Sequence, residues 1–242
     1  MLSRVELTPS ASSLPCHPID DLRLTNKSNI LQSSTVIRKS SILMNISQLV
    51  IATRNAGKLR EFRQLLAHTG RKILRIEDLG IGEDFEETGS SFVENARLKA
   101  RNYSLLTDIP VLGDDSGLEV VALGGRPGIR SARYAGPQAT DSDRVRKLLA
   151  ELEETGANRE ARFVCALALA RRGVVLFDAE GDCHGIIAPH PRGDRGFGYD
   201  PIFLFPELGR TYAELAEEEK NRVSHRARAV KSLLARIADI GP

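Results

Sequence analysis

The chain has 242 residues, of which 41% are hydrophobic and 27% charged, and its formal net charge is +2. Interspersed acids and bases without a basic stripe argue against a nucleic acid polymer as partner. Three cysteines, Cys16, Cys165 and Cys183, lack the C-x-x-C spacing, so they predict neither a disulfide framework nor a zinc site. No apolar run approaches the roughly 20 residues of a membrane-spanning helix. We therefore expect a soluble, cytoplasmic protein with no membrane partner.

The first residues differ in composition from the rest of the chain. Residues 1–43 hold nine serines and no aromatic residue. Glu6, Asp20 and Asp21 interrupt the segment, and it has no continuous apolar core, which argues against a signal or transit peptide. We interpret residues 1–46 as a disordered extension and residues 47–242 as the folded domain.

An apolar strand and an amphipathic helix are the first predicted elements. Residues 49–52 form a short apolar run that is typical of a buried strand. A helix is predicted after a polar connection at residues 53–58. The apolar face of this helix is formed by Leu59, Phe62, Leu65 and Leu66. The connection itself reads Thr53-Arg54-Asn55-Ala56-Gly57-Lys58.

This connection has the features of a phosphate cradle. The start of a helix offers unpaired N–H groups and the positive end of a dipole, both of which suit an anion. Gly57 lets the backbone approach a ligand, Lys58 adds a charge, and Thr53 and Asn55 add hydrogen-bonding side chains. The P-loop pattern is absent. The alternative is an ordinary strand-to-helix connection with a solvated lysine.

A second helix is predicted to begin after Ser91, because Ser91 and Glu94 fit a capping box. Its apolar face is formed by Phe92, Ala96, Ala100 and Tyr103. Glu87 precedes this helix, where an acid stabilises the helix dipole unless the fold brings it to a metal. Lys99 lies in mid-helix, where a solvated lysine is the default expectation.

Val111 and Leu112 predict a short strand that runs into an acidic turn, Asp114-Asp115-Ser116-Gly117. Carboxylate oxygens suit Mg²⁺, and the end of a strand is a common ligand site in α/β proteins. Adjacent side chains of an extended chain point in opposite directions, so only one carboxylate needs to face the site. The alternative is a purely structural turn, because Asp, Ser and Gly all favour turns. Residues 118–123 are predicted to form a further strand.

The second half of the chain predicts a helix capped by Thr140, then a hairpin, and finally a helix from about Ser224. Residues 163–170 are apolar on both faces, as in a central strand, and residues 174–177 are predicted to pair with them. The mixed order of strands and helices predicts an α/β protein with a partly antiparallel sheet.

Two segments of this second half carry candidate binding groups. In the glycine-rich loop at residues 191–201, Phe197 and Tyr199 offer either a stacking face for a base or an anchor to the core. The donors in the segment at residues 217–226 are suited to the carbonyl oxygens of a purine. These donors are Lys220, His225 and Arg226. The alternative is a solvated helix face followed by a cap at Ser224.

Together these segments resemble the inosine/xanthosine triphosphate pyrophosphatase family, from about residue 49 to residue 234. Each motif is weak alone, but seven in order at compatible spacing are specific. They are Thr53-x-Asn55-x-x-Lys58, Glu86-Glu87-Thr88-Gly89, Glu94-Asn95-Ala96 with Lys99, Asp114-Asp115-Ser116-Gly117-Leu118, Gly124-Gly125-x-Pro127-Gly128-x-x-Ser131-Ala132-Arg133-Tyr134, Gly196-Phe197-Gly198-Tyr199-Asp200-Pro201 and Glu219-Lys220-x-x-x-Ser224-His225-Arg226. Ala227 departs from the pattern, which has glycine at that position.

The resemblance implies a two-lobed α/β fold around a long mixed β-sheet with flanking helices, a homodimer, and Mg²⁺ as cofactor. It implies hydrolysis of ITP, dITP and XTP to the nucleoside monophosphate and pyrophosphate. By position, Glu87 and Asp115 bind the metal, and Asp115 is also the catalytic base that activates water. The substrate-binding residues are Thr53, Arg54, Asn55, Ala56, Gly57, Lys58, Lys99, Ser116, Phe197, Gly198, Tyr199, Asp200, Lys220, His225 and Arg226. Asp114 receives no defined role.

Two other functions are compatible with the sequence. One is a pyrophosphatase for other modified nucleotides on a related fold. The other is a catalytically silent nucleotide-binding protein, against which the presence of both carboxylates and Lys58 argues.

Overall fold

One mixed sheet forms the centre of the molecule. The computed structural model describes residues 46–155 and 158–238, so the extension predicted at residues 1–46 lies outside the described residues except for Ile46. The sheet has seven strands in the order β2-β1-β3-β4-β5-β6-β7. β1 is parallel to β2 and β3, and all other neighbours are antiparallel. The predicted α/β class with a partly antiparallel sheet is confirmed.

The strands differ widely in length. They are β1 (Gln48–Ala52), β2 (Lys72–Arg75), β3 (Val111–Val120), β4 (Glu160–Arg171), β5 (Val174–Ile187), β6 (Phe203–Phe205) and β7 (Arg210–Thr211). The α-helices are α2 (Ala56–Leu66), α3 (Phe92–Tyr103), α4 (Asp141–Thr155), α5 (Glu217–Val223) and α6 (His225–Ala238). Short 3₁₀-helices connect them, among which η4 (Gly128–Arg133) and η5 (Asp200–Ile202) border the site. In the described ranges no helix has both the length and the apolar character needed to cross a membrane.

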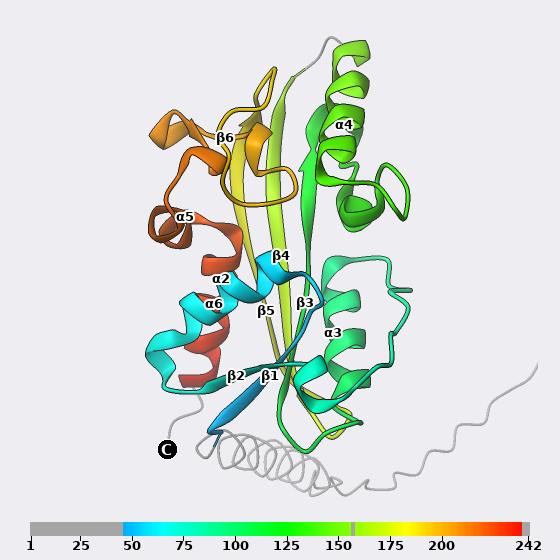
Figure 1. Cartoon of the computed structure of the whole chain (residues 1–242), viewed down its shortest axis with the longest axis vertical. Coiled ribbons are helices and arrows are strands. Elements are labelled where there is room, and N and C mark those ends of the chain that lie inside the picture. Colours follow the sequence, from blue (N-terminus) through cyan, green and yellow to red (C-terminus); the bar gives the residue numbers. More distant parts are fainter. Residues whose placement is uncertain (1–45, 156–157, 239–242) are drawn as a thin grey trace, which may run out of the picture.

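The long strands β3, β4 and β5 run through both halves of the molecule (Figure 1). In the lower half of the view, α2 and α6 cover one face of the sheet and α3 covers the other. The two faces follow from the alternation of side chains along β4, where Cys165 and Leu167 pack toward α2 and α6, while Val164 and Ala166 pack toward α3. In the upper half, α4 packs with Phe163 and the segment around Phe203 in a separate core.

The predicted acidic turn is wrong, because β3 continues without interruption through residues 114–117. Asp114 pairs with Leu167 and Asp115 with Ala166 in the antiparallel ladder with β4. Pairing with this long apolar strand overrides the turn preference of Asp, Ser and Gly. The strand predicted at residues 118–123 is the end of β3, which stops at Val120.

Local signals located the helix starts correctly. Ser91 accepts a hydrogen bond from the backbone N–H of Glu94 at 3.2 Å, as the capping box predicts. The Glu94 carboxylate, however, accepts from the N–H of Ser90 at 2.8 Å rather than from that of Ser91. Thr140 caps α4 by accepting from the N–H of Asp143 at 3.2 Å.

The backbone of α6 lies directly against β5 at Gly181. A Cβ atom at this position would lie 2.2 Å from the backbone nitrogen of Ala229 and 2.5 Å from the carbonyl oxygen of His225. Neither backbone atom can move alone, because α6 is held by the core that it shares with α2. Gly181 therefore sets the distance between the helix and the sheet.

We predict that Gly181→Ala lowers the free energy of unfolding by about 1–3 kcal/mol, because the added methyl forces α6 away from β5. Urea denaturation measures this change. Gly82→Ala is the control, since a Cβ at Gly82 meets no atom within 4 Å. Equal stability of the two variants would contradict the packing argument.

Candidate active site

A cleft opens where β1 ends beside β3. The pairing of β1 with β3 stops at Ala52 and Gly113, so the part of β3 from Asp114 onward lies beyond the end of β1. Two adjoining cavities occupy this place and share Asn55, Lys58 and Glu87 in their walls. All the predicted site residues except Ala56 and Gly57 line one or both of these cavities.

The two predicted metal ligands lie on the α3 side of the cleft. Asp115 points toward α3, and Asn95 Nδ2 donates a hydrogen bond to its Oδ2 at 3.0 Å. Burial raises the pKa of Asp115 to about 6, and the nearby charge of Glu87 adds to the increase, although Lys99 and Lys58 oppose it. Glu87 itself pairs with Lys99 Nζ at 2.5 Å and with Arg133 Nη1 at 3.6 Å.

This pair of carboxylates matches the donor set of a Mg²⁺ site more than that of a transition metal. Among the described residues no group of three or more His, Cys, Asp or Glu side chains is arranged to hold a metal. Mg²⁺ typically binds only one or two carboxylates and completes its coordination with water and substrate phosphates. A cation would also relieve the unfavourable burial of Asp115 beside Glu87. The residues present therefore fit Mg²⁺.

The predicted phosphate cradle is an ordered helix start. Asn55 Oδ1 accepts the backbone N–H of Lys58 at 3.0 Å and thereby caps α2, while Thr53 Oγ1 accepts the N–H of Asn55 at 3.3 Å. Arg54 donates to the carbonyl oxygens of Gly82 and Glu83 at 3.0 and 2.7 Å, and so holds the segment that leads to Glu87. Thr53, Arg54 and Asn55 thus have structural partners in addition to the roles predicted for them.

Three cations line the part of the cleft beside α2 and α3. The ammonium group of Lys99 donates to the carbonyl oxygen of Asp114 at 2.9 Å, and Lys58 Nζ donates to Asp114 Oδ2 at 2.6 Å. Arg133, which sequence reasoning did not select as a site residue, lines both cavities beside Glu87. These cations offset the charges of Asp114, Asp115 and Glu87 at the place where the helix dipole of α2 also favours an anion.

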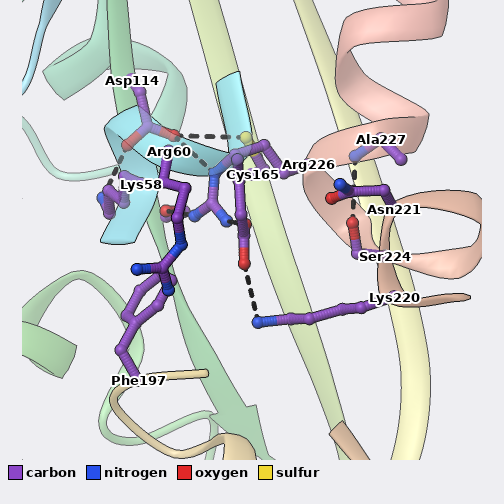
Figure 2. Close-up of polar contacts among 12 residues, drawn as sticks. Lys58, Arg60, Asp114, Cys165, Phe197, Lys220, Asn221, Ser224, Arg226 and Ala227 are labelled. Atoms are coloured by element: carbon purple, nitrogen blue, oxygen red, sulfur yellow. Dashed lines mark hydrogen bonds and ion pairs between the residues drawn. The ribbon is translucent and has the colours of Figure 1, made fainter. Parts of the chain in front are cut away.

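Asp114 points to the opposite face of β3 from Asp115. Its side chain is fully buried, and Figure 2 shows its carboxylate between Lys58 and Cys165, with Arg226 on the same side. Burial opposes ionisation, but the charges of Lys58 and Arg226 outweigh it and lower the pKa of Asp114 to about 2. Asp114 is therefore a permanent anion behind the cleft.

Phe197, the predicted stacking residue, lines the cavity on the other side of the cleft. Its ring lies against Gly57, where a Cβ would come within 2.4 Å of Phe197 Cδ1, and Lys220 Nζ lies 4.9 Å from the ring centroid. The N–H of Phe197 donates to Asp200 Oδ2 at 2.8 Å, and the N–H of Gly198 donates to Asp141 Oδ2 at 2.6 Å. The backbone of the glycine-rich loop is thus held in place at Phe197, which carries the ring, and at the next residue, Gly198.

Tyr199 and His225 are held against the core of the upper half. The hydroxyl of Tyr199 donates to the carbonyl oxygen of Ser131 at 3.0 Å, so this ring is an anchor, which was one of the two interpretations from the sequence. The His225 ring stacks on Phe163 with 4.7 Å between centroids. Burial and the charges of Arg226 and Lys220 hold the pKa of His225 well below its usual value, so the ring is neutral.

Lys220 and Arg226 share a buried carboxylate that sequence reasoning missed. Glu61 of α2 pairs with Lys220 Nζ at 2.8 Å and also with Arg226, whose Nη2 donates to Ser116 Oγ at 3.0 Å. Lys220 also pairs with Asp200 at 2.5 Å. The only local signal for Glu61 is its place one turn after Lys58, next to the apolar residue Phe62.

The cap between α5 and α6 confirms the prediction for Ser224. Its Oγ accepts the backbone N–H of Ala227 at 3.2 Å (Figure 2). The departure from glycine at Ala227 therefore leaves the cap intact, because the bond uses only the backbone of that residue.

Comparisons with known proteins agree with this architecture. The model of the Ham1 family matches residues 49–236. A dITP/XTP pyrophosphatase of Geobacillus kaustophilus is 52% identical over 78% of this chain and 93% of its own, and that of Bacillus subtilis is 45% identical over 78% and 96%. Among solved structures, a HAM1 protein from Coxiella burnetii has a TM-score of 0.72 at 42% identity, covering 79% of this chain and 98% of its own.

We predict that Glu61→Gln lowers the free energy of unfolding by about 3 kcal/mol near pH 7, because two buried cations lose their shared anion. Burial opposes ionisation of Glu61, but Arg226 and Lys220 outweigh it and lower its pKa below the ordinary 4.5. The stabilisation by Glu61 is therefore complete above the pKa that its carboxyl has in the unfolded chain. It is lost as the pH falls through the lower pKa that this carboxyl has in the folded protein.

Urea denaturation at several pH values checks this prediction. The stability difference between wild type and Glu61→Gln should shrink as the pH falls below the ordinary pKa. Glu217→Gln is the matched control, since Glu217 is 45% exposed in its pair with Arg60 and should change stability by no more than about 1 kcal/mol. A loss at Glu61 no larger than that at Glu217 would refute the buried-pair argument.

Proposed function

Because the chain belongs to the Ham1 family, we propose that it hydrolyses non-canonical purine nucleoside triphosphates to the monophosphate and pyrophosphate. The relatives named dITP/XTP pyrophosphatase indicate dITP and XTP as substrates, and the family resemblance adds ITP. One observation carries the proposal: a single cleft joins a carboxylate pair with flanking cations to an aromatic ring with buried donors. A catalytically silent protein would not need Asp115 held with a raised pKa beside Glu87.

The triphosphate binds on the side of α2 and α3. Lys58, Lys99 and Arg133 supply positive charge there, and the start of α2 adds its dipole. Phosphoryl transfer depends mainly on positioning and on stabilising charge, so these groups hold the reacting phosphates and offset their charge in the transition state. Asn55 and Thr53 keep the helix start in shape for this contact.

Glu87 and Asp115 would hold Mg²⁺, which when bound clamps phosphate oxygens and makes water easier to deprotonate. Asp115 is the base that accepts the proton of the attacking water. Burial raises the pKa of this carboxylate to about 6 in the absence of a cation, and bound Mg²⁺ would lower it, so Asp115 is ionised and able to accept a proton near neutral pH. Asn95 fixes the orientation of that carboxylate through its amide hydrogen bond.

The base binds on the side of Phe197, whose ring stacks on the purine. Lys220, His225 and Arg226 present donors to the six-position oxygen and the base edge. Adenine carries an amino group at that position, which would leave buried donors unpaired at a large cost in free energy. Discrimination against adenine follows from this arrangement.

The homodimer and the cytoplasmic location implied by the family resemblance also belong to the proposal. A nucleotide-pool enzyme acts where nucleotides are made and used. Size-exclusion chromatography with light scattering measures the assembly directly.

A substrate panel tests the activity. We predict that dITP and XTP have a kcat/KM roughly 100-fold above that of dATP, measured as pyrophosphate release in the presence of Mg²⁺. Removal of divalent cations with EDTA should abolish the activity, and excess Mg²⁺ should restore it. Equal rates on dATP and dITP, or undiminished rates in EDTA, would contradict the proposal, and preference for a modified pyrimidine triphosphate would favour the related alternative.

Asp115→Asn tests the chemical step. We predict that turnover falls by about 10²–10⁴-fold, since the amide cannot accept the proton of water. The fold should be retained, as judged by circular dichroism and the melting temperature. Asp108→Asn is the control, because Asp108 is 80% exposed and pairs with Arg172 outside both cavities. A variant at position 115 with near-normal turnover would remove Asp115 as the base.

A further inference from the structure

Charges of opposite sign alternate from the phosphate side of the site to the base side. The series runs through Lys58, Asp114, Arg226, Glu61, Lys220 and Asp200. Most neighbours in the series are in direct contact, from Lys58–Asp114 at 2.6 Å to Lys220–Asp200 at 2.5 Å. The exception is Asp114 and Arg226, where Nε and Oδ1 are 3.9 Å apart. The contact between Asp114 and Arg226 is therefore the weakest in this series.

The long contact between Asp114 and Arg226 leaves one polar atom of each side chain without a strong hydrogen bond. Arg226 Nε is buried, and within the described part of the chain it has no hydrogen-bond partner. Among residues 46–155 and 158–238, the Asp114 Oδ1 that faces it accepts only from the thiol of Cys165, at 3.3 Å, and a thiol is a weak donor. Buried unpaired donors are costly, so a small shift that joins Arg226 Nε to Asp114 Oδ1 is favourable.

The strong partner of Asp114 lies in the wall of the cleft. Lys58 Nζ is bound to Asp114 Oδ2, yet its side chain is 16% exposed and lines both cavities. A triphosphate would compete with Asp114 for this ammonium group. Asp114 has no exposed surface, so water cannot compensate a weakened pair, and Arg226 is the nearest other cation.

We propose that Asp114 is a positioning residue that couples phosphate binding at Lys58 to base recognition by Arg226. As the phosphates draw Lys58 into the cleft, the carboxylate of Asp114 turns toward Arg226 Nε and fixes the guanidinium against the base. Because such coupling is reciprocal, a purine that engages Arg226 also favours the release of Lys58 to the phosphates. The inference rests on the proposed function, since it concerns the same substrate and site.

Asp114→Asn tests this coupling, because asparagine keeps the shape and removes the charge. We expect the ratio of kcat/KM for dITP over dATP to fall by roughly tenfold or more. Inhibition by pyrophosphate, which probes the phosphate side alone, should strengthen, because Lys58 no longer has to leave a buried carboxylate to reach the phosphates. Asp178→Asn is the matched control, since Asp178 pairs with Arg97 and Arg236 away from the cleft. The ratio of kcat/KM for dITP over dATP in Asp178→Asn should equal that of wild type.

A merely structural role of Asp114 would lower kcat/KM equally for dITP and dATP and leave their ratio unchanged. That result would overturn the proposal. If Asp114→Asn does not fold, Lys58→Gln tests the coupling from the other end. Without the ammonium group of Lys58, Asp114 pairs with Arg226 whether or not phosphates are bound. This variant should therefore prefer inosine over adenosine as inhibitors, both of which lack phosphates, more strongly than wild type does. An unchanged preference would overturn the proposal. Failure of the wild type to hydrolyse dITP would instead refute the proposed function.

Discussion

The alternation of side chains along β3 sends Asp115 toward α3 and Asp114 toward α2 and α6. Each face of the sheet thereby receives one carboxylate, and each carboxylate collects its own partners. Asp115 meets the groups suited to a metal and to water, whereas Asp114 organises cations on the far side. One short extended segment thus supplies both the proposed base and a carboxylate that pairs with the cations proposed to hold the substrate.

Burial makes charge pairing on the α2 and α6 side a strict requirement. Arg226 and Lys220 lie almost fully out of water, and Glu61 and Asp200 compensate them from two different parts of the chain. Replacing such groups with apolar residues often costs no stability. In this protein the buried pairs hold the donors of Lys220 and Arg226 in the wall of the cavity that we propose to bind the base.

The sequence was informative where structure depends on neighbours in the chain. Caps at Ser91 and Thr140 are local hydrogen bonds, and the helices start where these residues predict. Residues 114–117 were assigned to a turn because their strand character comes from β4, some 50 residues later in the ladder. Glu61 was missed for the same reason, since its partners Lys220 and Arg226 follow far along the chain. The family resemblance selected the cleft residues, but not the contacts that orient them.

The contact between Phe197 and Gly57 joins the two sides of the cleft. Gly57 leaves room for the ring, because a Cβ at this position would lie 2.4 Å from Phe197 Cδ1. A methyl group at position 57 would push the ring away from α2, so the combination of a glycine and an aromatic ring sets the width of the cleft at this point.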